Sequence, residues 1–439
     1  MGTAVVLFHR DLRVHDHPAL AAAGAAADRV VPVFVLDPHL RDTVGPNRLR
    51  FLVECLADLR ESLRRRGADL LIRRGDPVAE ALRVATACDA TAIHASGDVG
   101  AYATARQRRL ISACAGARLS YALHPGVTLV PPGAVKPAGG DRHYRVFTPY
   151  LNAWRQHPWR AGAGAPARLR LPEALRTVEA GNLPRRPGGA AGDLLPGGES
   201  AARKRLASWA RRAGSYPDVR DDLAADATSR LSAYLHFGCL SPRQVAAACS
   251  DQAEFLRQLC WRDFHHQVLG AFPDLPRRAY RPRGPERWRD DPDALAAWQG
   301  GHTGVPVVDA GMRQLAAQGF MHNRARLITA TYLVRVLGLD WRDGGSWYDR
   351  HLADADVANN YGNWQWVAGT GNDTRPNRGF NPVRQARRFD PQGVYVRRWV
   401  PELAGVEGTA VHEPWRLPGP DRRTLRYPPP LALPAARGR

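Results

Sequence analysis

The chain has 439 residues, 44% of them hydrophobic and 24% charged, a balance that indicates a globular protein of two or three domains and excludes a disordered chain. Basic residues outnumber acidic ones by 62 to 42, which gives a net charge of +20 and predicts a polyanionic partner. No apolar run approaches the roughly 20 residues of a membrane-spanning helix, and VVLF leads straight into charged HRDLR, so we expect a cytoplasmic protein without anchor or signal peptide, with nucleic acid as its first candidate partner.

The first part of the chain alternates short apolar segments with helical patterns. Runs of strand length, rich in β-branched residues, lie at 3–8, 30–36, 69–72 and 91–95. Helical patterns lie between them, notably at 48–66 and 102–115. This alternation predicts an α/β domain over residues 1–126, with a parallel Rossmann-like sheet and helices on both faces. No G-x-G-x-x-G follows the first strand, so we expect no dinucleotide-binding loop there.

The remainder of the chain predicts a connector and a helical domain. Residues 127–198 are rich in proline and glycine, which indicates a long connector with one short helix at 148–156. Residues 199–439 are predicted to form an all-α domain, which contains ten of the twelve tryptophans. Its helical patterns lie at 199–213, 229–237, 242–249, 251–269, 292–299, 308–318, 322–337 and 346–353. The six cysteines include no CxxC pair, so no metal site or disulfide framework is expected.

Polar residues gather in several of these helical segments. In TSRLSAYL, hydroxyl groups at the expected start of a helix are typical of a phosphate site, although an ordinary helix cap has the same pattern. In QLCWRDFHHQV, Gln258, Trp261, Arg262 and His265 fall on one helix face, which favours a polar pocket over an apolar core. The segment HLADADVANNYGNWQWVAGTGND combines acids, amides and tryptophans, as a site that hydrogen-bonds a heteroaromatic ring requires.

Taken in order, these motifs resemble the DNA photolyase/cryptochrome family. The opening FHRDLRVHDHPAL is similar to that family's FRxDLRxxDNPAL. The resemblance continues through TSRLS, LCWRDF, DAGMRQL, MHNR, LDWR, DADVANN, WQW, FNP, VRRWVPEL and VHEPW, and so covers essentially the whole chain. It implies an α/β domain, a long connector and a helical FAD-binding domain, with a pattern nearest to bacterial repair enzymes for cyclobutane pyrimidine dimers.

The resemblance implies an FAD site within the helical domain. The segment that grips the FAD phosphates and ribityl chain corresponds to Tyr216, Thr228, Ser229, Arg230, Leu231 and Ser232. Three further cofactor-binding positions are Gln258, Trp261 and Arg262. Arg326 and Asp354 match a salt-bridged pair beside the isoalloxazine ring. Asp356 matches an acid near the flavin pyrimidine edge, and Asn360 matches the amide that faces flavin N5. An amide at N5 cannot easily protonate it, which favours the fully reduced flavin of a repair enzyme over a photosensor.

The resemblance also assigns an electron relay and a lesion pocket. Trp288, Trp341 and Trp364 match the tryptophans that carry electrons from the surface to photoexcited flavin. Trp261 and Trp366 match the aromatic walls around a flipped-out dimer, beside Asn323 and Arg324. Arg378 and Arg398 are candidate DNA-backbone contacts, or simply part of a solvated charged face. The implied activity is light-driven repair of dimers by a monomer that works at the bacterial nucleoid.

Two positions depart from the family pattern. Gln258 stands where dimer-repairing members usually have Glu, so a cryptochrome-like photoreceptor and repair of (6-4) photoproducts remain alternatives. The (6-4)-specific members carry a histidine pair where this chain reads HNR, with His322 but no second histidine. Tyr102 and Ala103 replace the Asn-Glu pair that holds a folate antenna, so a deazaflavin is the expected second chromophore, with an empty antenna site as the alternative. A DNA-binding protein without flavin is a third, weaker interpretation.

Overall fold

The computed structural model describes residues 2–41, 44–176, 181–372 and 380–433. The chain forms two compact units, each assembled from segments that are distant in the sequence. Unit 1 comprises Met1–Gly189, Leu195–Gly214 and Ser229–Asp274. Unit 2 comprises Ala190–Leu194, Ser215–Thr228 and Leu275–Arg439. Among the described residues, no helix combines the length and the apolar character needed to cross a bilayer.

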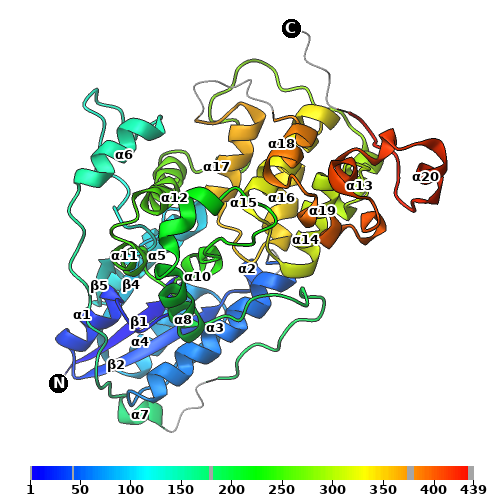
Figure 1. Ribbon diagram of the computed structural model, residues 1–439. Coiled ribbons are helices and arrows are strands. Elements are labelled where there is room, and N and C mark those ends of the chain that lie inside the picture. Colours follow the sequence, from blue (N-terminus) through cyan, green and yellow to red (C-terminus); the bar gives the residue numbers. More distant parts are fainter. Residues whose placement is uncertain (1, 42–43, 177–180, 373–379, 434–439) are drawn as a thin grey trace. The chain divides into compact units, whose positions relative to one another are not determined.

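Unit 1 contains the predicted parallel sheet (Figure 1). Its strands are β1 (Thr3–Phe8), β2 (Arg29–Leu36), β3 (Leu71–Arg74), β4 (Ala90–Ser96) and β5 (Ser120–His124), in the spatial order β3-β2-β1-β4-β5. In register, Phe8 of β1 lies opposite Phe34 of β2, and Leu7 lies opposite Ala95 of β4. The α/β fold class is therefore confirmed. The fifth strand was not predicted, because SYALH is a half-exposed edge strand without a continuous apolar run.

Both faces of the sheet are buried. Val5 and Leu7 pack in one cluster with residues of α4 (Pro77–Ala87) and α5 (Ala101–Gly116). Val6 and Phe8, which point to the opposite face because side chains alternate along a strand, are also inaccessible to solvent. Helix α1 (Pro18–Ala26) contacts the sheet, and α3 (Pro46–Arg64) contacts α8 (Glu199–Ala210). Burial on both faces explains why the strands are continuous apolar runs.

A buried acid anchors the Pro/Gly-rich connector to a helix of unit 1. Asp263 lies on α12 (Ala253–Ala271), and its Oδ2 atom accepts hydrogen bonds from the backbone N–H groups of Leu129 and Val130 at 2.9 and 3.0 Å and from the indole of Trp154 at 2.9 Å. Trp154 belongs to α6 (Phe147–Gln156), the helix expected within this stretch. Three donors on one carboxylate stabilise the negative charge that burial would otherwise disfavour. The other helices of unit 1 are α2 (Pro38–Arg41), α7 (Glu173–Arg176), α10 (Ser232–His236) and α11 (Pro242–Ala248).

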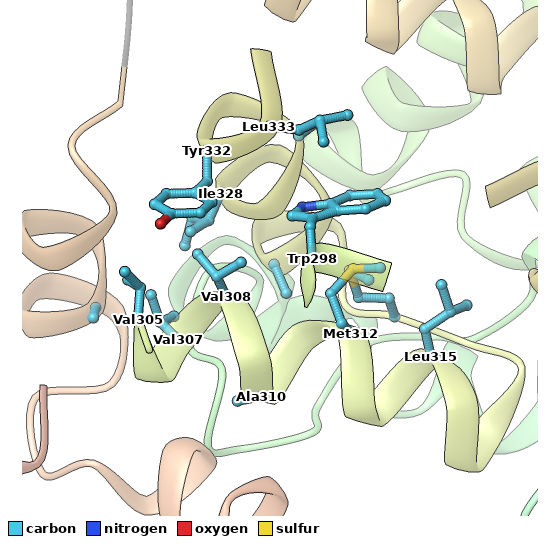
Figure 2. Close-up of a cluster of buried hydrophobic side chains, with 14 of the residues drawn as sticks. Trp298, Val305, Val307, Val308, Ala310, Met312, Leu315, Ile328, Tyr332 and Leu333 are labelled. Carbon is cyan, nitrogen blue, oxygen red and sulfur yellow. The ribbon is translucent and has the colours of Figure 1, made fainter. Parts of the chain in front are cut away.

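Unit 2 is helical, as predicted. Figure 2 shows part of its core, where Trp298 lies among apolar side chains of α14 (Pro306–Gln318), α15 (Asn323–Thr331) and the turn that follows α15. Added Cβ atoms at Gly344 and Gly345 would meet Trp364 and Tyr361 at 2.1 and 2.7 Å, so these glycines let α16 and α17 approach closely. The main helices are α9 (Tyr216–Val219), α13 (Pro292–Gly300), α14 (Pro306–Gln318), α15 (Asn323–Thr331), α16 (Trp341–His351), α17 (Val357–Ala368), α18 (Pro382–Phe389), α19 (Val394–Trp399) and α20 (Gly419–Thr424).

Three predicted helix boundaries were wrong. The helix expected over 229–237 begins only at Ser232, because Arg230 has a left-handed backbone (φ 50°) that is incompatible with an α-helix. The helix expected over 322–337 changes at Tyr332 into the π-helical turn η2 (Tyr332–Leu337). The helix expected over 346–353 starts five residues earlier, at Trp341, where the Asp340 carboxylate caps the N–H of Arg342.

Candidate functional site

The expected phosphate-binding segment is a shaped loop that precedes α10. Asp226 and Arg230 both have positive φ, 45° and 50°, which non-glycine residues seldom adopt outside constrained sites. Within unit 1, the Ser229 hydroxyl accepts from the N–H of Leu231 at 3.3 Å, and the Ser229 carbonyl accepts from Arg205 at 2.7 Å. In unit 2, the Thr228 hydroxyl is buried without a hydrogen-bond partner among the described residues. A buried hydroxyl of this kind is expected to have a partner, and an anionic ligand would supply one.

Unit 2 brings together the expected ion pair beside the flavin. Arg326 on α15 contacts both carboxylate oxygens of Asp354 through one nitrogen, at 2.9 and 3.1 Å. The Arg326 Nε atom also donates to the Met321 carbonyl at 2.9 Å, which fixes the guanidinium in place. The Asp354 side chain is 5% exposed and that of Arg326 is 23% exposed, so one end of the pair is accessible. The pair thus presents a positioned positive charge at the surface of the α15–α17 region.

Two further expected residues lie at the start of α17: Asp356 immediately precedes the helix, and Asn360 lies just after its first turn. The Asp356 carboxylate accepts from the backbone and side-chain nitrogens of Asn359 at 3.0 and 2.8 Å, so it is the N-cap of the helix. Asn360 is buried, and its amide nitrogen donates to the Gly345 carbonyl at 2.9 Å. Because this bond engages the amide nitrogen, the group that Asn360 can offer to a ligand is its side-chain oxygen, which is a hydrogen-bond acceptor.

His322, which the sequence singled out only as the histidine of the HNR segment, is a buried neutral donor. Its Nδ1 atom accepts from the N–H of Arg324 at 3.1 Å and caps α15, so the ring proton resides on Nε2. Burial lowers the pKa of His322 to about 4. The charge of Arg324 lowers this pKa further, whereas the charge of Asp221 raises it. The Nε2 atom has no hydrogen-bond partner among the described residues. The ring therefore offers a fixed N–H donor at neutral pH.

The three expected relay tryptophans all belong to unit 2 but have different surroundings. Trp364 and Trp341 are buried, at 2% and 0% exposure, whereas Trp288 is partly exposed. Trp364 packs edge-on against Tyr348, with ring centroids 5.0 Å apart, and Trp341 packs edge-on against Tyr361 at 6.4 Å. These contacts place Trp364 and Trp341 within the aromatic part of the unit 2 core.

The residues expected to share a face of α12 have different surroundings in unit 1, and His265 among them is buried. Gln258 and Trp261 are partly exposed, and the indole of Trp261 is stacked on Phe147 with centroids 3.6 Å apart. Stacking covers one face of that indole and holds the ring in a fixed plane. Arg262 is directed elsewhere, because its guanidinium donates to the Val127 carbonyl in the connector.

The expected DNA-contacting residues of unit 2 are partly engaged within the unit. Arg324 forms an ion pair with Asp221 at 2.7 Å, and its guanidinium lies 4.3 Å from the Phe389 ring centroid. Trp366 lies beside Phe380, with centroids 5.7 Å apart, and Asn323 is exposed. Arg398, on α19, lies 5.7 Å from the Trp399 ring centroid. Arg378 lies outside the described residues.

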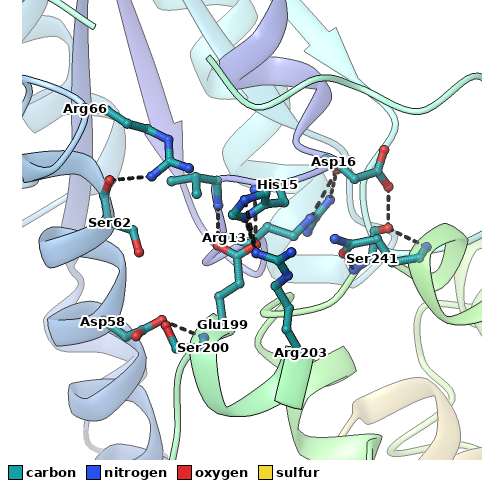
Figure 3. Close-up of polar contacts among 12 residues, drawn as sticks. Arg13, His15, Asp16, Asp58, Ser62, Arg66, Glu199, Ser200, Arg203 and Ser241 are labelled. Atoms are coloured by element: carbon teal, nitrogen blue, oxygen red, sulfur yellow. Dashed lines mark hydrogen bonds and ion pairs between the residues drawn. The ribbon is translucent and has the colours of Figure 1, made fainter. Parts of the chain in front are cut away.

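The FHRDLRVHDH motif is a structural clasp within unit 1 (Figure 3). The buried Glu199 carboxylate accepts from the N–H groups of Val14 and His15 at 2.8 and 3.1 Å, and from the His15 ring at 2.8 Å. Arg13 donates to the Gly238 carbonyl at 2.9 Å, just beyond α10. Asp16 pairs with Arg160 at 2.7 Å, which lowers the pKa of Asp16 against the opposing effect of partial burial. The motif thus ties β1 to the helices that follow the connector.

Polar residues also gather where β1, β2 and β4 end. Arg10 joins Asp98 at 3.1 Å and the His236 carbonyl at 2.9 Å. The Tyr102 hydroxyl is bonded to Asp37. Burial, and then the charge of Arg106, lower the pKa of His9 to about 3, so its ring is neutral. Because β1 lies between β2 and β4, this edge is the point at which the strand order reverses, where ligands of open α/β sheets bind.

Comparisons with known proteins agree with this architecture. The family described as "DNA photolyase" matches residues 4–170, and "FAD binding domain of DNA photolyase" matches residues 255–435. A deoxyribodipyrimidine photo-lyase of Streptomyces griseus is 48% identical, over 100% of this chain and 98% of its own length. A cryptochrome DASH of Gloeobacter violaceus is 36% identical, over 94% of this chain and 89% of its own length.

A solved structure extends the similarity to three dimensions. The crystal structure of a class III photolyase from Agrobacterium tumefaciens superposes with a TM-score of 0.91 at 32% identity, over 98% of this chain and 94% of the other. The match at 48% identity covers the whole chain, and the two family matches lie within it. The chain therefore belongs to the DNA photolyase/cryptochrome family and carries that family's FAD-binding domain.

Proposed function

We propose that the protein is a light-driven enzyme that repairs cyclobutane pyrimidine dimers in DNA with FAD as its cofactor. The observation that carries the proposal is the full-length, 48% identity to a deoxyribodipyrimidine photo-lyase, joined to the buried Thr228 hydroxyl, which has no hydrogen-bond partner among the described residues. Bound FAD supplies light absorption and the electron that the lesion receives and returns. No net oxidation of the lesion or of the flavin results.

The residues of the chain fit the polar parts of such a cofactor. The buried Thr228 hydroxyl would donate to a phosphate, together with donors of the Ser229–Ser232 loop. The carbonyl oxygen of Asn360 would accept from an N–H group on the flavin ring, since its amide nitrogen is bonded to Gly345. Arg326, held by Asp354, would place positive charge beside the ring and favour its anionic form. Tyr216, Arg230, Gln258, Arg262 and Asp356 complete the proposed set.

The lesion would be held by aromatic and basic groups. Trp261, fixed by Phe147, and Trp366, beside Phe380, each offer a planar surface for an extruded base. Extrusion of a damaged pair costs a few kcal/mol, less than for an intact one, and stacking offsets that cost. Gln258 would donate its amide N–H to a pyrimidine carbonyl, while Asn323, Arg324 and Arg378 would contact the lesion or its phosphates. Trp364, Trp341 and Trp288 would relay electrons that keep the flavin reduced.

A second chromophore would bind at the C-terminal edge of the sheet in unit 1. Tyr102, with the Arg106 guanidinium 5.6 Å from its ring centroid, and the half-buried neutral His9 supply aromatic surface and hydrogen-bonding groups there. A deazaflavin fits these groups better than a folate, because Tyr102 and Ala103 cannot grip a pterin with two side-chain amide or carboxylate groups.

Oligonucleotides with one defined lesion test the proposed activity. The reduced, FAD-loaded protein should repair a cyclobutane dimer under blue light, leave it unchanged in the dark, and leave a (6-4) photoproduct unrepaired. Gln258→Glu should retain repair of the dimer and raise its yield per photon, since a carboxyl group can also supply a proton. Absence of light-dependent dimer repair at saturating enzyme would overturn the proposal, and a change in partner binding on flavin reduction would then indicate a photoreceptor.

A further inference from the structure

The outermost relay tryptophan has a carboxylate at its indole nitrogen. The Nε1–H of Trp288 donates to Oε2 of Glu286 at 3.4 Å, and the Glu286 side chain is 24% exposed. The same Oε2 atom lies 2.7 Å from a guanidinium nitrogen of Arg342, which orients the carboxylate. A proton acceptor with access to water therefore stands at the one atom from which an oxidised indole loses its proton.

The next tryptophan has the opposite surroundings. Trp341 is fully buried, and its Nε1–H has no hydrogen-bond partner among the described residues. The guanidinium of Arg342 lies 4.5 Å from the Trp341 ring centroid. A cation over the ring face stabilises the neutral indole and disfavours its radical cation. Among the described residues, Trp341 thus has no proton acceptor at its indole nitrogen.

Arg342 links the two tryptophans. It donates to Asp340 at 3.0 and 3.1 Å and to the Arg277 carbonyl at 2.8 Å, in addition to its contact with Glu286. These four polar contacts hold the guanidinium between the Trp341 ring and the Glu286 carboxylate. Although partial burial acts in the opposite direction, the bonds to Glu286 and Asp340 raise the pKa of Arg342, so it stays charged.

We propose that Glu286 is the proton acceptor that traps the oxidised state of the relay on Trp288, and that Arg342 positions Glu286 while it disfavours oxidation of Trp341. This inference rests on the proposed function, because it requires Trp288 and Trp341 to carry electrons to the flavin. This difference between Trp288 and Trp341 makes the relay directional. Once Trp288 has lost its proton as well as an electron, return of the electron also requires a proton, so charge recombination is slow.

The step balances in electrons and protons. Trp288 loses one electron inward through Trp341 and Trp364 to the photoexcited flavin, which is the oxidant. The Nε1–H bond of Trp288 then breaks, and its proton passes to Oε2 of Glu286 and on to water. A neutral indolyl radical remains on Trp288, and a small thiol in solution returns one hydrogen atom to it.

Transient absorption after a laser flash on the FAD-loaded protein tests this assignment, because the indole radical cation and the neutral indolyl radical have different spectra. Glu286→Gln keeps the shape and removes the base, so conversion of the radical cation to the neutral radical should slow about 100-fold, the lower end of the usual contribution of a positioned base. Charge recombination should then increase at the expense of the long-lived state. Glu407→Gln, at an exposed glutamate of the same unit, is the matched control and should leave both rates unchanged.

Arg342→Gln provides a second, independent variant. Loss of the guanidinium should also slow deprotonation at Trp288 and should leave a larger share of radical cation, because Trp341 is no longer disfavoured. An unchanged conversion rate in Glu286→Gln, or no tryptophan radical in the wild type, would overturn the inference. Dimer repair by chemically reduced protein, measured on the same samples, does not need the relay. Failure of the inference with repair intact is therefore distinguishable from failure of the proposed function.

Discussion

Replacement of Glu199 by alanine should destabilise unit 1 without touching any flavin-directed residue. Glu199 is 3% exposed, and its carboxylate accepts the N–H groups of Val14 and His15 and the ring of His15. Truncation leaves these donors without their acceptor. The variant therefore measures how much the N-terminal motif contributes as a clasp rather than as part of a binding site.

The size of the effect follows from the exposure of each donor. The His15 side chain is 34% exposed, so water can replace its lost bond, and we assign it no cost. The Glu199 side chain is 4% exposed, and the hydrogen bond from each of the two backbone N–H groups to this charged group contributes about 1.5 kcal/mol or more. Their sum is about 3 kcal/mol, which corresponds to about a 150-fold change in an opening equilibrium.

Hydrogen exchange of the β1 amides, measured by mass spectrometry, reports that equilibrium directly. Exchange in residues 3–8 should accelerate about 150-fold in Glu199→Ala. Glu61→Ala is the control, because the Glu61–Arg65 pair is more than half exposed at both ends and should contribute less than about 0.5 kcal/mol. Equal exchange rates in the two variants would refute the assignment of Glu199 as the centre of the clasp.

Three more predictions concern the cofactor, acid stability and DNA. Thr228→Val should raise the Kd of the apoprotein for FAD about tenfold or more in an absorbance titration, since it removes one bond to a charged phosphate. His322 has a folded pKa of about 4 against an ordinary value of 6.5, so unfolding takes up a proton below pH 6.5. The contribution of His322 to the unfolding free energy should therefore be constant above pH 6.5 and fall by about 2 kcal/mol on going to pH 5. His322→Asn, which keeps a helix cap, should lose this part of the pH dependence when denaturant unfolding is measured at both pH values. Arg384→Ala, at an exposed position of α18, should lower by about one the slope of log K against log salt for DNA binding, as measured by fluorescence anisotropy, whereas an unchanged slope would mean that α18 does not contact phosphates.

Most of the fold could be predicted because burial leaves a clear pattern. Strands β1 and β2 are buried on both faces and therefore appear as continuous apolar runs. Strand β5 and the late start of α10 could not be predicted in this way. The edge strand has no such run, and the left-handed backbone of Arg230 depends on contacts that a single sequence does not reveal. The π-helical turn at Tyr332 is likewise invisible in a helical pattern.

The candidate site was predictable in part. The contact between Arg326 and Asp354, expected from the family pattern, is present. Asp263 and Glu286 were missed, because their roles depend on what lies opposite them: connector N–H groups for Asp263 and an indole nitrogen for Glu286. Asp263 lies within the LCWRDF motif, and its place beside Arg262 on a mainly buried helix was the one available signal. Glu286, in an exposed segment, gave none.

Turnover per reduced flavin tests the central claim most directly. Repair that borrows an electron and returns it consumes no reductant, so one anaerobic sample of reduced protein should repair many dimers per molecule under continuous blue light. The repair should stop when the light is turned off and resume when it returns, with the flavin absorption unchanged throughout. Repair that ends after one dimer per protein, proceeds in the dark, or oxidises the flavin in proportion to the dimers lost would contradict the account.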